Sequence, residues 1–399
     1  MSEVSSSDYN QGANLITPIR RRRGISRKLS QSNLLKGGGK LHKPTAFLLV
    51  GFLFGFFLFP HESRALVNFE GKKVVLTIAF NVGGGSDRWA RVFAPYLSKH
   101  LPGNPTVVVR NIPGGGGISG VNRFVARARP NGLDLLGTSG SNQIPYILGD
   151  KRVRYEYKKM HIVLASPMGG FAYVSPKTGI KNLKDLKSFK GELQYASQGA
   201  TSLDLVPLLA FEILGLNVKA ILGYRGRGPG RVAFEQGVVN IDYQTTPAYL
   251  RSVKPMVEKG KAMMLFSWGQ LDNQGNLVRD PVEPDLPHFA EAYEMIYGKK
   301  PSGPAFDAWK AFFVSGFAVQ KPMWLPEGTP DSVVQTYRNA ASKIMQDPSF
   351  QKDLKKKLGG YAPYVGDDAH RAFEQALQVP PESMAWLKKW LQERFNVQL

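Results

Sequence analysis

Three segments rich in glycine and serine stand between an expected strand and an expected helix, where they could bind an anion. The segments are residues 83–87, 113–117 and 197–202. The first turn of a helix has unpaired backbone N–H groups and partial positive charge, and both attract anions. One such turn also fits a tight connection that binds nothing, but three in one chain favour a shared anion such as a carboxylate.

Signatures of nucleotide binding and of catalysis are missing from the sequence. No Gly-Lys-Ser/Thr follows the first glycine run, and Gly83-x-Gly85 lacks the third glycine of a dinucleotide site. The chain has no cysteine, its six histidines show no zinc spacing, and it has no Gly-x-Ser-x-Gly. We therefore predict that the protein is not an enzyme and has no catalytic residue, cofactor or metal.

The three turns belong to an alternation of strands and helices. Apolar runs typical of buried strands are found at 74–80, 106–109, 133–138, 162–165, 172–174, 194–197, 218–221 and 239–243. Apolar residues at helical spacing predict helices at 89–97, 121–128, 203–214 and 230–236. This order predicts α/β architecture with parallel sheets. Further along, we expect a strand at 311–314 and helices at 330–346, 367–377 and 380–395.

Residues 1–65 differ from the rest in composition. Residues 1–45 have nine basic and two acidic side chains, a net +7 of the total +21, and are predicted to be disordered. The uncharged apolar segment 46–59 is shorter than a membrane-spanning helix and fits an export signal. Ser63-Arg64-Ala65 could be cleaved. We predict a periplasmic protein whose signal is either removed or kept as a short inner-membrane anchor, giving membrane association through 46–59.

The remaining positive charge is spread thinly over the other residues. The runs 299–300 and 355–357 are short, and aromatic residues do not alternate with them as a platform for stacking bases would require. We therefore predict no binding of nucleic acid.

Several motifs occur together along the chain, at residues 80–87, 90–91, 107–117, 126–136, 224–226, 237–241 and 326–330. The first reads Phe80-Asn81-Val82-Gly83-Gly84-Gly85-Ser86-Asp87. In this order they resemble the receptors of tripartite tricarboxylate transporters, which are solute-binding proteins of the Bug type. The resemblance extends over roughly residues 74–375.

The resemblance implies a two-lobed periplasmic-binding-protein fold of type II, the Venus-flytrap fold, which closes on a ligand. Lobe 1 would begin with 66–170, lobe 2 would be 171–265, and 266–399 would return to lobe 1 with an inserted loop, 269–304, and the C-terminal helices. The implied function is an extracytoplasmic receptor that captures a small organic mono-, di- or tricarboxylate. It would deliver this ligand to a tripartite tricarboxylate-type permease in the membrane.

The resemblance also implies which residues bind the ligand. Those of the first lobe are Phe80, Gly84, Gly85, Ser86, Asp87, Ser139 and Ser141. Those of the second lobe are Ser197, Gly199, Thr201, Ser202 and Gln244.

This sequence departs from the family pattern at several positions. Val82 replaces a proline, Asp204 stands near a usual histidine, Gln244 replaces an aspartate, and 269–304 is unusually long. An alternative is therefore a membrane-anchored structural or assembly subunit that keeps the receptor fold without transport. Arg225 and Arg227 are interpreted either as an attraction for the anionic ligand or as a pair of surface arginines.

Overall fold

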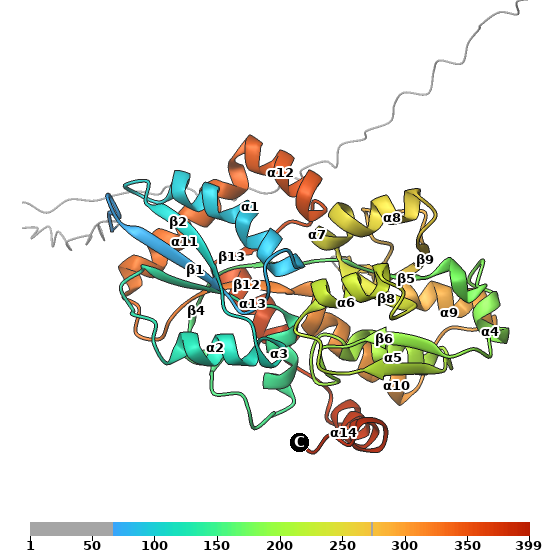
Figure 1. Ribbon diagram of the computed structural model, residues 1–399. Helices are drawn as coiled ribbons and strands as arrows, with labels where there is room; N and C mark the ends of the chain where they lie inside the picture. The colour runs from blue at the N-terminus through green and yellow to red at the C-terminus, as the bar shows by residue number, and fades with distance from the viewer. Residues whose placement is uncertain (1–66, 273) are drawn as a thin grey trace, which may run out of the picture. The chain divides into compact units, whose positions relative to one another are not determined.

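Figure 1 shows a computed structural model of the protein, which describes residues 67–272 and 274–399. The basic tail, the apolar segment 46–59 and the predicted cleavage site lie outside these residues. Of the helices in the described ranges, none is both long and apolar enough to cross a membrane. Two large sheets with helices packed around them organise the described chain (Figure 1).

The first sheet has its strands in the order β13-β4-β12-β3-β1-β2. Their bounds are β1 Lys73–Ile78, β2 Thr106–Asn111, β3 Asp134–Gly137, β4 His161–Ser166, β12 Lys321–Leu325 and β13 Tyr364–Val365. β1 is parallel to β2 and β3, whereas β12 is antiparallel to β3 and β4. The prediction of a purely parallel sheet is therefore wrong. A strand that returns from far along the chain is not tied to a right-handed crossover and can enter in either direction.

Helices cover this sheet because their apolar residues recur on one face. In α1 (Gly85–His100), Trp89, Phe93 and Leu97 are four residues apart and fully buried. The indole N–H of Trp89 donates to Ser166 Oγ at 3.0 Å, which ties α1 to β4. The other helices of this half are α2 Ile118–Val125, α3 Gly140–Ile147, α11 Asp331–Gln346, α12 Pro348–Leu358 and α13 Asp367–Ala376.

The second sheet has the order β7-β6-β8-β5-β9. Its strands are β5 Gly170–Val174, β6 Leu193–Ala196, β7 Val218–Ile221, β8 Ile241–Thr245 and β9 Met263–Ser267. β6 is parallel to β7 and β8, and β5 is antiparallel to β8 and β9. Its helices are α4 Asp185–Ser188, α5 Leu205–Ile213, α6 Arg227–Glu235, α7 Thr246–Ala248 and α8 Lys254–Glu258.

The chain passes from the first sheet to the second between β4 and β5, and it returns before β12. Some helices of the segment 266–399 pack beside the second sheet and not beside the first. α9 (Phe289–Tyr297), α10 (Pro304–Phe313) and α14 (Pro381–Phe395) have buried residues in the apolar core beside the second sheet. This placement differs from the assignment of the whole segment 266–399 to the first lobe, and the lobe limits themselves stay a prediction.

Two other expectations from the sequence are wrong. The expected strand 311–314 is the end of α10 and the start of a wider π-helical turn, Val314–Ala318. The apolar run there suits a strand, but Trp309, Phe313 and Phe317 stack along one helical face with ring centroids 5.2 and 5.8 Å apart. The expected loop 269–304 contains α9 and a small hairpin, β10 (Gln270–Leu271) with β11 (Leu277–Val278).

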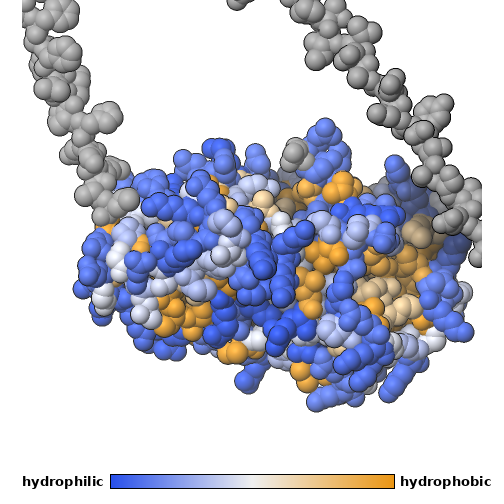
Figure 2. Space-filling view, turned by 90° about the horizontal axis from the view of Figure 1, so that it is seen from above, coloured by the Kyte–Doolittle hydropathy of each residue, from blue (hydrophilic) through white to orange (hydrophobic). Residues whose placement is uncertain are grey.

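The surface on one side of the molecule is mainly polar (Figure 2). Seen from above, the described residues present a mostly hydrophilic face on which apolar residues form separate groups (Figure 2).

Candidate functional site

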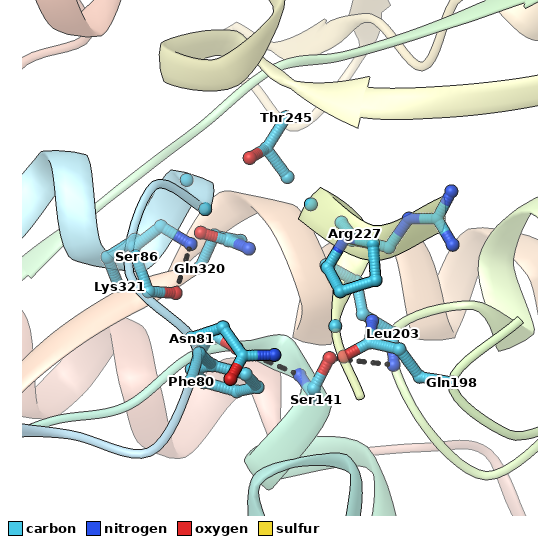
Figure 3. Close-up of a pocket in the computed structure, with 16 residues that line it drawn as sticks. Phe80, Asn81, Ser86, Ser141, Gln198, Leu203, Arg227, Thr245, Gln320 and Lys321 are labelled. Carbon is cyan, nitrogen blue, oxygen red and sulfur yellow. Dashed lines mark hydrogen bonds between the residues drawn. The ribbon is translucent and has the colours of Figure 1, made fainter. Parts of the chain in front are cut away.

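A cavity brings together residues from elements of both sheets (Figure 3). Its volume is about 40 Å³, which is room for a few water molecules. Half of the predicted ligand-binding residues line it, namely Phe80, Gly84, Gly85, Ser86, Ser139 and Ser141. Arg227, interpreted from the sequence as a possible attraction for the ligand, also lines the cavity. The sequence analysis did not connect the other lining residues with the ligand: Asn81, Gln198, Leu203, Gly226, Gly228, Pro229, Thr245, Gln320 and Lys321.

The amino end of α1 forms one wall of the cavity. Gly84 is extended, with φ −75° and ψ 171°, and among the residues that the structure describes no side chain caps the helix. The first-turn N–H groups therefore have no side-chain acceptor, as an anion site requires. Asp87 does not line the cavity. Its carboxylate accepts the Gly83 N–H at 2.8 Å and pairs with Arg91 at 3.0 Å, so it holds the glycine turn in place.

The amino end of α3 forms a second part of the wall. Ser139 caps this helix, accepting the Ser141 N–H at 3.3 Å, while its own N–H donates to Asn142 Oδ1 at 3.0 Å. Ser141 Oγ accepts the N–H of Leu203 at 3.3 Å, which connects α3 to the loop before α5. Both predicted serines are thus in the lining, and both already have a local hydrogen-bond partner.

Most of the loop predicted to grip the ligand from the second lobe faces a neighbouring pocket and not the main cavity. Ser197 Oγ accepts the Gly199 N–H at 3.1 Å, and Ser202 Oγ donates to the Gly199 carbonyl at 2.7 Å. Thr201 Oγ1 donates to Asp150 at 3.4 Å. Gly199, Thr201 and Ser202 line a separate small pocket, and only Gln198 and Leu203 of this region reach the main cavity. That the loop grips a ligand stays a prediction.

The amino end of α6 takes the place expected for that loop. Gly226, Gly228 and Pro229 line the cavity, and Arg227, the first residue of α6, lies across it from Ser86 of α1 (Figure 3). The sequence could have indicated this wall, because residues 226–230 are another glycine-rich junction between a strand and a helix. Gly85 and Thr245 meet across the cavity, since a Cβ on Gly85 would lie under 3.0 Å from Thr245 Oγ1.

The side chain of Arg227 is buried, with 8% of its surface exposed, so its interpretation as a surface residue is wrong. Its guanidinium forms ion pairs with Asp204, at 3.3 Å, and with Asp242. It also lies 5.0 and 4.6 Å from the ring centroids of Tyr195 and Tyr243. Burial lowers the pKa of Arg227 and the carboxylate of Asp204 raises it, and the net direction is upward. The residue therefore stays charged.

Gln244 belongs to this buried network and not to the cavity lining. Its Nε2 donates to the Arg227 carbonyl at 2.9 Å and to Asp242 Oδ2 at 3.0 Å. Asp204, which stands near the family's usual histidine, accepts the Gln198 N–H at 2.6 Å. These contacts fix α6 and the preceding loop against the second sheet, so this wall of the cavity is rigid.

Two polar residues of the returning chain complete the cavity, and neither was predicted. Gln320 and Lys321 are buried at the start of β12. Lys321 Nζ donates to Ser86 Oγ at 3.1 Å, and burial lowers the pKa of this lysine to about 7. The one feature of the sequence that could have drawn attention to them is that two polar residues stand near the start of the otherwise apolar segment 319–325. In the ranges that the structure describes, no three His, Asp or Glu residues are arranged to hold a metal ion.

Comparison with known proteins identifies the family. Residues 89–296 match the model described as tripartite tricarboxylate transporter family receptor. The chain belongs to this receptor family. A Cupriavidus necator protein of the family named UPF0065 is 26% identical over 296 residues, 72% of this chain and 79% of the relative. The protein BugT of Bordetella pertussis is 29% identical over 195 residues, 47% of this chain and 58% of BugT.

Solved structures of periplasmic binding proteins have the same fold. BugD superposes with a TM-score of 0.62 at 23% identity, over 79% of this receptor and 97% of BugD. MatC from Rhodopseudomonas palustris, solved with bound malate, gives 0.58 at 20% identity over 79% and 98% of the two chains. An R. palustris protein solved with adipate gives 0.62 at 20% identity over 80% and 96%.

These findings confirm the predicted family and the two-lobed α/β fold. Members of the family are substrate-binding receptors, so the prediction that this chain is not an enzyme agrees with its family.

Proposed function

We propose that the protein is a periplasmic receptor that captures a small organic carboxylate and delivers it to a tripartite tricarboxylate-type membrane transporter. The observation that carries the proposal is the pair of helix ends, α1 and α6, that face one cavity from the two sheets. Uncapped N–H groups and two helix dipoles suit a carboxylate from opposite sides. Family membership and the relatives solved with malate and adipate support the same ligand class.

The mechanism is capture without chemistry. The cavity has room for a few waters and is crossed by contacts such as Gly85 with Thr245. Ligand entry therefore requires the lobes to separate by hinge rotation, after which closure brings α1 and α6 onto the carboxylate. Export through the segment 46–59 belongs to the proposal, whether or not that segment is cleaved.

A stability screen tests the capture step. The purified protein is heated with malate, adipate, succinate or citrate, because a ligand of the folded state at about 100 times its Kd adds roughly 2.7 kcal/mol. We expect at least one acid to raise the melting temperature by several degrees. No shift with any acid would contradict the proposal and favour the membrane-anchored assembly subunit. Delivery is tested separately, by uptake of the bound acid in cells with and without the receptor.

A further inference from the structure

Lys321 is a buried cation in the wall of the ligand cavity. It is the first residue of β12, a strand between β3 and β4, and 2% of its surface is exposed. Its Nζ donates to Ser86 Oγ, in the first turn of α1, at 3.1 Å. In residues 67–272 and 274–399, no acidic group forms an ion pair with it.

The elements around Lys321 do not neutralise its charge. The charged side chains on the helices that line the cavity beside Lys321 are Asp87, Arg88 and Arg91 on α1 and Arg227 on α6. Asp134 on β3 and His161 on β4 lie toward the opposite end of β12, where His161 is in register with Leu325 and Trp324 with Leu136. Asp87 is engaged by the Gly83 N–H and by Arg91. Burial is the cause of the lowered pKa of Lys321.

Arg227, the second buried cation of the cavity wall, has the partners expected of a cation that stabilises the fold. Arg227 is neutralised by the carboxylates of Asp204 and Asp242 and covered by two aromatic rings. Its guanidinium points away from the cavity (Figure 3). Lys321 has a single hydroxyl in place of two carboxylates, although an unpaired buried ammonium is strongly unfavourable. Fold stability alone therefore does not account for a lysine at this position.

The surroundings of Lys321 indicate what would neutralise it. The lysine, the uncapped end of α1 and Gln320 all line the same cavity (Figure 3). Gln320 Oε1 is buried and has no hydrogen-bond partner in the described chain, so this corner also offers an acceptor to a ligand hydroxyl. A carboxylate at this point would receive hydrogen bonds from Nζ and from the helix amides together.

We propose that Lys321 is the residue that selects the ligand by charge, pairing with a carboxylate group seated at the amino end of α1. The inference rests on the proposed function, because it names the charge partner within the same site. The expected ligand is an organic acid with one carboxylate at Lys321, and a hydroxyl near Gln320 would strengthen its binding.

Isothermal titration calorimetry of the purified protein with malate, adipate, succinate and citrate tests this role. For each acid that binds, Lys321→Met should weaken affinity about 10- to 100-fold at pH 6.5, as loss of a charge-assisted hydrogen bond does. Methionine is one atom shorter than lysine, but it fills most of the same space without a buried charge, so the melting temperature should not fall. Lys177→Met, at an exposed position, is the matched control and should leave affinity unchanged.

The pH dependence of wild-type binding gives a measurement that does not rely on a variant. Free Lys321 titrates near pH 7, and a bound carboxylate would keep it protonated to higher pH. Affinity should therefore fall roughly 25-fold from pH 6.5 to 8.5, with proton uptake on binding. Lys321→Met should abolish most of this dependence.

The outcomes separate the two proposals. If the wild type binds none of the four acids, the proposed function fails, and this inference fails with it. If the wild type binds an acid but Lys321→Met binds it within twofold, or if wild-type affinity is the same at both pH values, only the role of Lys321 is overturned.

Discussion

The close approach of Gly85 to Thr245 predicts that a single methyl group will hinder closure of the receptor. Gly85 is the first residue of α1, and Thr245 is the last residue of β8 in the other sheet. A Cβ on Gly85 would lie under 3.0 Å from Thr245 Oγ1 but 3.7 Å from Thr245 Cβ, an ordinary contact. The clash in Gly85→Ala is therefore with the hydroxyl alone.

The size of the effect follows from this geometry. Overpacking by one methyl group costs about 1–3 kcal/mol, and it acts on the closed form only, because open lobes separate the two residues. Carboxylate affinity should fall roughly 5- to 150-fold, measured by calorimetry with the tightest-binding acid of the panel. The unfolding free energy should not decrease, since alanine is a better helix former than glycine.

A second substitution makes the prediction strict. Thr245→Ala removes the clashing hydroxyl, so Gly85→Ala with Thr245→Ala should recover most of the lost affinity, whereas Gly85→Ala with Thr245→Ser should not. Wild-type affinity in Gly85→Ala, or equal losses in both double variants, would refute the closed contact as the cause.

Three further predictions concern the buried polar groups. Asp204→Asn should lower the unfolding free energy in urea by about 3 kcal/mol, since it breaks a buried ion pair, whereas Glu393→Gln, at an exposed pair, should change it by less than about 0.5 kcal/mol. Burial raises the pKa of Asp280 to about 6 from 3.8, so its contribution to stability is full below about pH 3 and lost above about pH 7. Urea titrations should show a fall of about 3 kcal/mol over that range that Asp280→Asn removes. Ser86→Ala should weaken carboxylate binding about tenfold, whereas Thr201→Ala should leave it within twofold, and the reverse result would place the site at the loop 197–202.

The glycine turn before α1 was predictable because its chemistry is local. A strand, a run of glycines and an apolar helix follow one another in the sequence, so the uncapped helix end could be located without a fold. The same reasoning assigned the second wall to 197–202, whereas the main cavity is lined by the amino end of α6 together with Gln198 and Leu203, and a role of 197–202 in ligand binding stays a prediction. In that loop the Ser202 hydroxyl donates to the Gly199 carbonyl and the Thr201 hydroxyl donates to Asp150. No sequence pattern shows which hydroxyls already have such a partner.

Lys321 and Arg227 could not be interpreted from sequence for a different reason. Lys321 meets Ser86 across 235 positions, through a strand that enters the first sheet from late in the chain. Arg227 is charged like any surface arginine until Asp204 and Asp242 are brought to it by the second sheet. In both cases burial, and not residue type, decides the role, and burial depends on strand order.

The contacts that close the cavity also set how fast a ligand can leave. Gly85 meets Thr245, and Asn81 donates to the Arg225 carbonyl at 3.3 Å, so both sides of the opening are joined. In the proposed mechanism a captured acid leaves only after these contacts part, and the opening rate is therefore an upper limit on its dissociation rate. Acids that differ in affinity would share that limit. They would differ in how often the lobes close again before the acid has diffused away. Residence time is thus a property of the hinge as well as of the ligand.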